Sequence, residues 1–222
     1  LSNKFLTPTT LELGGKNPCV VDQTALIKTT AKRIVWGKFI NCGQTCIAPD
    51  FIIVHKKIKN ELLDEMINQI KKLFGNNHKN SNSYGRIISK KHLMYLKSLI
   101  KNEKILYGGE FDINEKFFEP TIVEVSSAQD KILDDEIFGP ILPIITYGSD
   151  NELDSILQRS KNPLAFYVFT NNKKFGKKLI NNYSFGGGAI NDTIGQIVNK
   201  NLPFGGIGNS GMGKYHGYET FK

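Results

Sequence analysis

The residue best suited to chemistry in this sequence is Cys46, in the stretch NCGQTCIAPD at positions 41–50. A glycine opens this turn, a helical pattern precedes it and an apolar strand pattern follows it. Cysteine is a nucleophile only as the thiolate, which is favoured in a partly exposed cleft where backbone N–H groups or a cation point at the sulfur. Cys46 is therefore the candidate nucleophile, and we expect such surroundings for its sulfur. The alternative, from the local sequence, is a small buried hydrophobic side chain.

Two carboxylates are candidates to work with this thiol. Glu12 lies between two leucines and just before Gly14-Gly15, and a carboxylate among apolar neighbours can act as a general base near neutral pH. Glu136 lies in a loop that Pro140 ends before an apolar strand pattern, a position suited to facing a ligand. From the local sequence alone, an ordinary exposed strand glutamate describes Glu12 equally well, and a helix-terminal acid is the alternative for Glu136.

Other site motifs have little support. The four histidines show no HxxxH or HExxH spacing and the three cysteines show no CxxC spacing, so no metal site is predicted. Seven glycines lie between positions 195 and 217. Neither a GxxxxGK[ST] order nor a strand-GxGxxG-helix context surrounds them, so we interpret them as structural rather than as a phosphate site.

The elements that must position these residues alternate along the chain. Thr24 and Ser89 are predicted to cap two of the helices. Apolar strands that alternate with helices indicate an α/β fold, a mostly parallel sheet covered on both faces, with catalytic groups at the strand ends. From residue 193 onward the sequence changes to a glycine-rich loop segment. Strands are predicted at 17–22, 51–55, 105–107, 121–125, 141–147, 164–170 and 189–191, and helices at 24–40, 58–74, 89–101, 151–160 and 173–183.

Length and composition limit the classes of protein. A chain of 222 residues with 40% hydrophobic residues can bury a sizeable core. The formal net charge is +8, but the lysines are spread over several helical patterns without a known nucleic-acid motif, so no nucleic-acid partner is predicted. No apolar run reaches the length of a membrane-spanning helix. The three cysteines indicate cytosolic thiols, and a cytoplasmic location is expected.

Five motifs, in this order along the chain, resemble the catalytic half of an aldehyde dehydrogenase. The SGMGKYHG pattern at 210–217 is most similar to the class 3 and fatty aldehyde branch. The resemblance extends over nearly the whole chain, and five ordered motifs are far more specific than any one of them. The motifs are LELGGKNP at 11–18, GQTCIAPD at 43–50, EIFGP at 136–140, NPLAFYVF at 162–169 and LPFGGIGNSGMGKYHG at 202–217.

The resemblance implies a role for each candidate residue. Cys46 would attack the aldehyde, and its backbone N–H would form part of the oxyanion hole. Glu12 would activate the water that hydrolyses the thioester. Glu136 would bind the nicotinamide ribose of NAD or NADP, and Phe138 would pack near the ring. The implied substrate is a medium- or long-chain aliphatic or aromatic aldehyde, and the implied assembly is a homodimer.

The same resemblance implies a Rossmann-like three-layer αβα catalytic domain over 1–192 and a C-terminal segment over 193–222 that returns toward the cofactor or oligomerisation region. The oxyanion-hole asparagine and the phosphate-binding loop have no match here. We therefore expect that a cofactor domain is missing and that the isolated chain is inactive as a dehydrogenase. An apolar anchor after Lys222 would place the protein at the endoplasmic reticulum membrane.

Two alternatives stay open. A thiol esterase or an aldehyde dehydrogenase that transfers the acyl group to coenzyme A would use the same cysteine, although Glu12 favours hydrolysis. A non-catalytic fragment that keeps the fold would not need Glu12, Cys46 and Glu136 together. Cys42, four residues before Cys46, also raises the prospect of oxidation between the two thiols.

Overall fold

The computed structural model describes residues 2–221 and is built on a seven-stranded sheet of order β10-β9-β2-β3-β8-β7-β4. The edge strand β4 (Lys104–Tyr107) is antiparallel to its neighbour β7. The other six strands are parallel, so the predicted mostly parallel sheet is confirmed. These strands are β2 (Pro18–Val21), β3 (Phe51–His55), β7 (Thr121–Val125), β8 (Ile141–Tyr147), β9 (Ala165–Phe169) and β10 (Gly187–Ile190).

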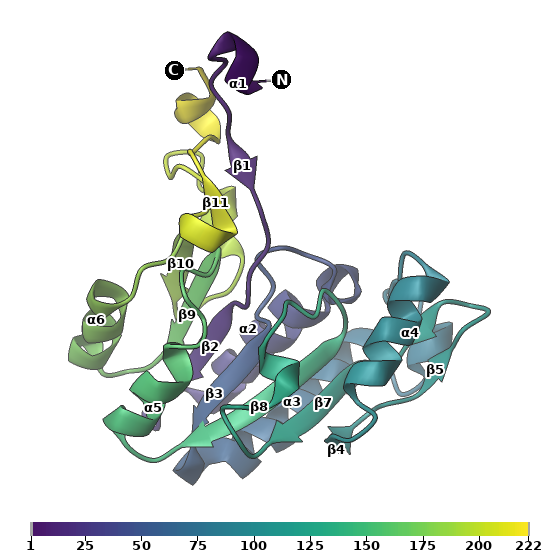
Figure 1. The fold of residues 1–222 in the computed structure, drawn as a ribbon. Coiled ribbons are helices and arrows are strands. Elements are labelled where there is room, and N and C mark those ends of the chain that lie inside the picture. The colour runs from purple at the N-terminus through teal and green to yellow at the C-terminus, as the bar shows by residue number, and fades with distance from the viewer. Residues whose placement is uncertain (1, 222) are drawn as a thin grey trace.

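Helices cover both faces of this sheet, which gives three layers. In Figure 1, α2 (Ile27–Phe39) and α3 (Lys59–Phe74) lie behind the sheet and α5 (Asp150–Leu157) lies in front of it. Because both faces are covered, every residue of β2, β3 and β9 is buried. The remaining helices are α4 (Lys90–Leu99) and α6 (Lys173–Asn182).

The two predicted helix caps have different outcomes. Ser89 caps α4, because its side chain accepts a hydrogen bond from the backbone N–H of His92. The Thr24 prediction is wrong, since α2 begins later, after Leu26, without a side-chain cap. The Thr24 hydroxyl instead donates to Asp22 Oδ2 at 2.5 Å and accepts from the backbone of the 170–172 loop. Thr24 thus binds the backbone of a neighbouring loop instead of capping the helix.

Several short elements have no counterpart in the predictions. β1 (Leu11–Glu12) and β11 (Gly211–Met212) form an antiparallel pair, and Figure 1 shows this pair in an arm that rises from the sheet and carries both ends of the chain. Strands of two residues have no detectable period in the sequence. The others are α1 (Ser2–Phe5), β5 (Phe111–Asp112), β6 (Phe117–Phe118) and 3-10 turns at 40–43, 56–58, 78–80, 131–133, 195–198, 208–210 and 217–221.

Each candidate site residue lies before the start of a strand of the seven-stranded sheet. Glu12 comes before β2, Cys46 before β3 and Glu136 before β8. They therefore meet at the amino-terminal edge of the sheet, whereas open α/β sheets commonly bind ligands beyond the carboxyl ends of their strands. The helices run back against the strands, so the carboxyl end of α2 arrives at this edge.

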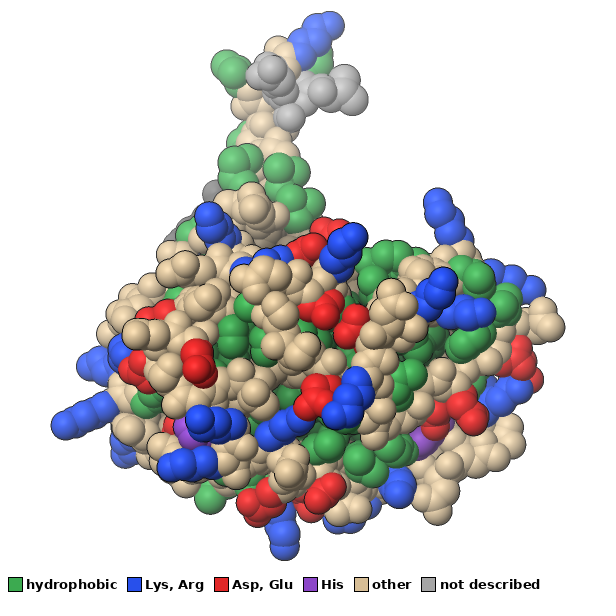
Figure 2. Space-filling model, turned by 60° about the horizontal axis from the view of Figure 1, so that its bottom comes forward, with side chains coloured by type: hydrophobic (Ala, Val, Ile, Leu, Met, Phe, Trp, Pro, Cys, Tyr) green, Lys and Arg blue, Asp and Glu red, His purple; other side chains and the backbone are tan. Residues whose placement is uncertain are grey.

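The surface charge is mixed. On the face shown in Figure 2, lysine and arginine side chains are interspersed with aspartate and glutamate and do not gather into one basic stripe. Ion pairs such as Lys79 with Asp112 and Lys178 with Asp150 account for part of this arrangement.

One buried side chain links the strands to the loop that carries Cys46. Asn17, only 1% exposed, donates from Nδ2 to the carbonyls of Cys46 and Ala48 at 2.7 and 3.0 Å. Its Oδ1 accepts from the N–H of Ala165, where β9 begins, at 2.8 Å. Its own carbonyl accepts from the N–H of Asp50 at 2.9 Å. The amide side chain therefore fixes the 46–50 loop to two neighbouring strands.

Replacing Asn17 with alanine should destabilise the protein by about 2 to 4 kcal/mol, because three hydrogen bonds are lost and buried backbone groups are left unsatisfied. Urea unfolding measures this change. Asn60→Ala is the matched control: Asn60 is exposed on α3, so its replacement should change the free energy of unfolding by no more than about 0.5 kcal/mol. Equal effects of the two substitutions would contradict the linking role of Asn17.

Candidate functional site

A sharp turn after α2 presents Cys46. The helix ends at Phe39, and Asn41, Cys42 and Gly43 then adopt left-handed backbone angles, with φ of 52°, 54° and 72°. Gly43 is required for a second reason, because a Cβ there would collide with the carbonyl oxygen of Gly139. The turn packs the backbone against a neighbouring loop and leaves the side chain of residue 46 at the edge of the core.

The carbonyls beyond Cys46 face the sheet. Besides the two bonds from Asn17, the carbonyl of Ile47 accepts from the Tyr167 hydroxyl at 2.6 Å. Ile47 itself is buried, whereas the Cys46 side chain is only partly buried. The loop is thus anchored through its backbone, and the sulfur is left accessible.

Cys46 and Glu12 are brought together although 34 positions separate them. The Cys46 Sγ donates to Glu12 Oε1 at 3.5 Å. The alternative of a small buried hydrophobic side chain describes Cys19 and Cys42, which are 0% and 1% exposed, but not Cys46. The local sequence left this alternative open for Cys46, and the ordered motifs were needed to favour it as the candidate nucleophile.

The electrostatic environment of the sulfur differs from the prediction. Burial raises the pKa of Cys46 to about 11, with further contributions from the negative charge of Glu12 and, more weakly, of Glu136. Its own backbone N–H acts in the opposite direction but does not prevail. The carboxyl end of α2 adds no positive potential. The expectation of thiolate-favouring surroundings is wrong for the described residues, and the side chain in contact with the sulfur is the Glu12 carboxylate.

Glu12 is exposed on β1, as expected for an ordinary glutamate on a surface strand. Its carboxylate nevertheless has two partners from distant parts of the chain. Oε1 faces Cys46, and Oε2 accepts from the hydroxyl of Tyr215. Exposure on a strand and a place in the site are therefore compatible.

A buried ionic cluster holds the loop that carries Glu136. The Nζ of Lys16 lies 2.6 Å from Asp50 Oδ2 and donates to the carbonyls of Ile132 and Asp135 at 2.6 and 2.8 Å. Asp50 in turn accepts from the N–H of Ile137 at 3.2 Å. Such a pair is tolerated in the interior because nearly all of its polar atoms are satisfied. The loop is thereby fixed on both sides of Glu136.

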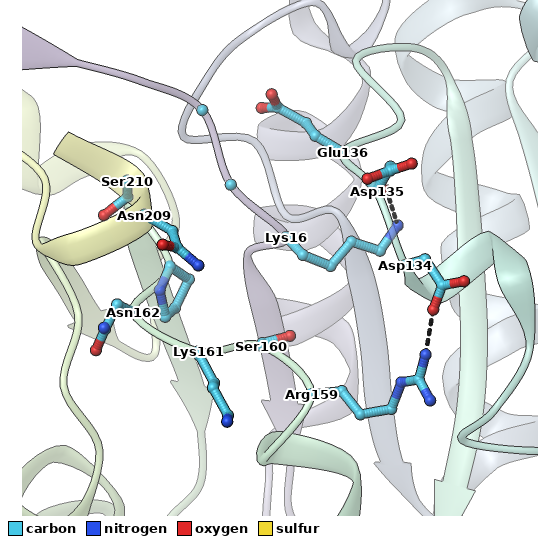
Figure 3. Close-up of a pocket in the computed structure, with 13 residues that line it drawn as sticks. Lys16, Asp134, Asp135, Glu136, Arg159, Ser160, Lys161, Asn162, Asn209 and Ser210 are labelled. Atoms are coloured by element: carbon cyan, nitrogen blue, oxygen red, sulfur yellow. Dashed lines mark hydrogen bonds and ion pairs between the residues drawn. The ribbon is translucent and has the colours of Figure 1, made fainter.

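Glu136 lies against the strand segment that leads from Glu12 to the sheet. A Cβ on Gly14 would collide with the Glu136 carboxyl, so only glycine permits this approach. Burial, together with the charge of Asp50, raises the pKa of Glu136 to about 7. Figure 3 shows its carboxyl pointing away from Lys16 and Asp135, at the rim of a hollow of about 300 Å³ whose lining also includes Lys161, Asn162 and Asn209.

Phe138 is exposed and has φ of 51°. Its carbonyl accepts from the His92 ring Nε2 at 2.8 Å, and the two rings are 6.5 Å apart in an edge-to-face arrangement. Phe138 thus lies in the same loop as Glu136, but its contacts are with His92 of α4. The structure places Glu12 in contact with Cys46 and Glu136 near enough to raise the pKa of Cys46, and it leaves Phe138 at the margin.

Sequence reasoning missed four residues that build this site: Asn17, Lys16, Asp50 and Tyr215. The first three were visible as polar residues directly beside predicted buried strands, where a side chain without a partner is costly. Tyr215 carried no comparable signal. In residues 2–221, no group of three or more His, Cys, Asp and Glu could hold a metal ion.

Comparison with known proteins gives a consistent set of relatives. The model of the aldehyde dehydrogenase family matches residues 1–222. The chain is 45% identical to 4,4'-diaponeurosporen-aldehyde dehydrogenase of Staphylococcus aureus, over 99% of this chain and 48% of that protein. It is 44% identical to the rat dimeric NADP-preferring aldehyde dehydrogenase and to mouse aldehyde dehydrogenase family 3 member A2, over 48% and 45% of their lengths.

Solved structures agree with these relatives. The substrate-bound state of Staphylococcus aureus AldH superimposes with a TM-score of 0.96 at 44% identity, over 99% of this chain and 48% of that chain. The chain therefore spans about half the length of the curated relatives that it matches.

Alkylation of the folded protein with limiting iodoacetamide should label Cys46 before Cys19 and Cys42. The reason is access: burial raises the pKa of both Cys42 and Cys46 to about 11 and that of Cys19 further still, so thiolate content does not favour residue 46 over residue 42. Peptide mapping over time measures the order. Faster labelling of either buried cysteine in folded protein would show that the assignment is wrong.

Proposed function

The chain belongs to the aldehyde dehydrogenase family, with a family 3 member among its relatives at 44% identity, and on this premise we propose that its site oxidises an aldehyde to a carboxylic acid. Cys46 is the nucleophile and Glu12 is the base. The observation that carries the proposal is the 3.5 Å contact between the Cys46 sulfur and the Glu12 carboxylate. A thiol with a raised pKa needs an adjacent base, and this carboxylate is in contact with it.

In the first step Glu12 Oε1 accepts the proton of the Cys46 thiol. The S–H bond breaks, and the electron pair left on sulfur attacks the aldehyde carbon to form a thiohemiacetal. The carbonyl oxygen becomes an oxyanion, for which the backbone N–H of Cys46 is a donor. The anchored carbonyls of the loop keep that N–H in a fixed orientation.

The residues around Glu136 fit a nicotinamide cofactor. The hollow beside it is lined mostly by polar and charged residues, and the Glu136 carboxyl lies at its rim. Glu136 would hold the ribose hydroxyls, and Phe138 would lie beside the ring. Bound there, NAD or NADP would supply the hydride acceptor needed to convert the thiohemiacetal on Cys46 into a thioester.

Hydrolysis of that thioester returns the site to its starting state. Glu12 first releases the thiol proton to solvent and then removes a proton from water. The resulting hydroxide adds to the thioester carbon, the C–S bond breaks and the carboxylic acid leaves, and Glu12 returns the proton to the Cys46 sulfur. Glu12 forms no covalent bond with the substrate, and its exposed position on β1 allows water to approach. The same carboxylate can therefore act as the base in both steps.

Ester hydrolysis is a second activity that the same residues favour. It needs the nucleophile, the base and an oxyanion donor, which lie together at one edge of the sheet. It needs no hydride acceptor. Transfer of the acyl group to coenzyme A is less favoured, because Glu12 is placed to activate water.

We propose a medium- or long-chain aliphatic or aromatic aldehyde as substrate and a homodimer as the assembly of the complete protein. The names of the relatives, one an aldehyde dehydrogenase described as dimeric, support these proposals. Within residues 2–221 no helix is long and apolar enough to cross a membrane.

In the complete protein, Glu12→Gln should keep a pre-steady-state burst of reduced cofactor, because loss of the negative charge that raises the pKa of Cys46 lets the thiol ionise to solvent. Steady-state turnover should fall by roughly 10²-fold to 10⁴-fold, as is typical when a general base is lost, since no carboxylate then activates the hydrolytic water. Stopped-flow absorbance separates the two phases. Glu61→Gln, on the exposed first turn of α3, is the control and should leave both unchanged. Normal turnover of the Glu12 variant would remove this residue from the mechanism.

Cofactor affinity should rise with pH through about 7, because the pKa of Glu136 is raised to about 7 and only the ionised carboxylate accepts hydrogen bonds from both ribose hydroxyls. Below that pH the protonated form predominates, and binding should weaken. Fluorescence titration of NAD and NADP between pH 6 and 8 measures the trend in the complete protein. Glu136→Gln should flatten it. A profile that keeps its slope in this variant would assign the titration to another group.

A further inference from the structure

The glycine-rich C-terminal segment takes part in the site. Its strand β11 pairs with β1, with Glu12 opposite Gly211, and the N–H of Leu13 donates to the carbonyl of Ser210 at 3.1 Å. The segment thus lies along the strand that carries the base. Four residues beyond that pairing it delivers the Tyr215 hydroxyl to the Glu12 carboxylate.

Tyr215 is held in place independently of Glu12. Its backbone N–H donates to the carbonyl of Phe204 at 2.8 Å, and its carbonyl accepts from the N–H of Phe204 at 2.7 Å. The two rings pack edge to face with centroids 5.9 Å apart, and Phe204 is buried. The position of the hydroxyl is therefore set by the surrounding fold, and it is the carboxylate that adapts to it.

Glu12 has the opposite character. Its residue is exposed, and an exposed glutamate has several rotamers of similar energy. Among the described residues, the hydrogen-bond partners of its carboxylate are Tyr215 at Oε2 and Cys46 at Oε1. One rigid donor thus fixes one oxygen, which places the other oxygen against the sulfur.

We propose that Tyr215 is a positioning residue, which holds Glu12 against Cys46 so that the resting nucleophile is a thiol whose proton acceptor is already in contact with it. The proposal rests on the proposed function for the identities of nucleophile and base. In the step concerned, the S–H bond breaks, an O–H bond forms at Oε1 and the electron pair stays on sulfur, so no oxidant or reductant takes part.

The ionisation of the three groups agrees with this arrangement. The hydrogen bond to Glu12 is the largest cause that raises the pKa of Tyr215 to about 12, so the phenol is a donor at neutral pH. The charge of Glu12, after burial, is the main cause that raises the pKa of Cys46. The charge of Glu136 also raises the pKa of Cys46. None of the compared variants changes Glu136, so its contribution is the same in all of them.

The test is the rate at which iodoacetamide alkylates Cys46 in the complete protein at pH 8, compared among Glu12→Gln, Tyr215→Phe and the double variant. Removing or releasing the carboxylate lowers the pKa of the thiol, and a fall of one pKa unit gives about ten times more thiolate. Both single variants should therefore react roughly three to ten times faster. The double variant should match Glu12→Gln, because the two residues act through one contact.

Controls separate this effect from loss of structure. Tyr183→Phe removes a tyrosine-to-carboxylate bond of the same kind, from Tyr183 to Asp154 at 2.6 Å between α6 and α5, and should react at the parent rate. Peptide mapping should show that Cys19 and Cys42 stay as unreactive as in the parent, since general unfolding would expose all three thiols.

Three results would overturn the proposal. If Tyr215→Phe reacts at the parent rate or more slowly while Glu12→Gln reacts faster, Tyr215 does not hold the carboxylate at the sulfur. If the two accelerations multiply in the double variant, the residues act separately. If Glu12→Gln itself is alkylated at the parent rate, Glu12 does not act on the Cys46 thiol. That result would contradict the proposed function, and not only the role of Tyr215.

Discussion

The arrangement of the site depends on the hydrogen bonds of one buried amide, Asn17. Three bonds from its side chain connect the loop after Cys46 to the start of β9, next to the strand that Asn17 itself precedes. Because the loop carbonyls are held toward the sheet, the Cys46 side chain is directed outward to the carboxylate. The ionic pair of Lys16 and Asp50 does the same for the loop of Glu136. Both loops are fixed by buried polar contacts. The side chains of Cys46 and Glu136 therefore do not have to be held in place by hydrophobic packing.

The location of the site at the amino-terminal edge of the sheet determines its chemistry. At the opposite edge, helix amino termini would supply N–H groups and positive potential that stabilise a thiolate. Here the carboxyl end of α2 leads into the turn, and the negative charges of Glu12 and, more weakly, Glu136 raise the pKa of the sulfur. The raised pKa of Cys46 favours the thiol over the thiolate, which agrees with the proposed proton transfer to Glu12. Such a thiol is also less prone to oxidation than a preformed thiolate.

Much of this arrangement was predictable where it depends on local pattern. The parallel strands, the helix periods and the Ser89 cap follow from neighbouring residues, and the ordered motifs identified Cys46, Glu12 and Glu136. The sign of the field at Cys46 was not predictable from residues 41–50, because it arises from carboxylates at positions 12 and 136. The β1–β11 pair was missed for the same reason. Each strand has two residues, and pairing depends on segments about two hundred positions apart.

The separation of Glu12 from Tyr215, 203 positions along the chain, has a consequence for biosynthesis. A ribosome that adds roughly 5 to 20 residues per second makes the tyrosine about 10 to 40 s after the glutamate. Cys46 follows Glu12 by 34 positions, so for most of that interval the nascent chain contains both the thiol and its proposed proton acceptor, while the phenol that orients the carboxylate has yet to be translated. Arrival of the glycine-rich segment then completes this contact, so nucleophile and base acquire their final geometry only after Tyr215 has been added.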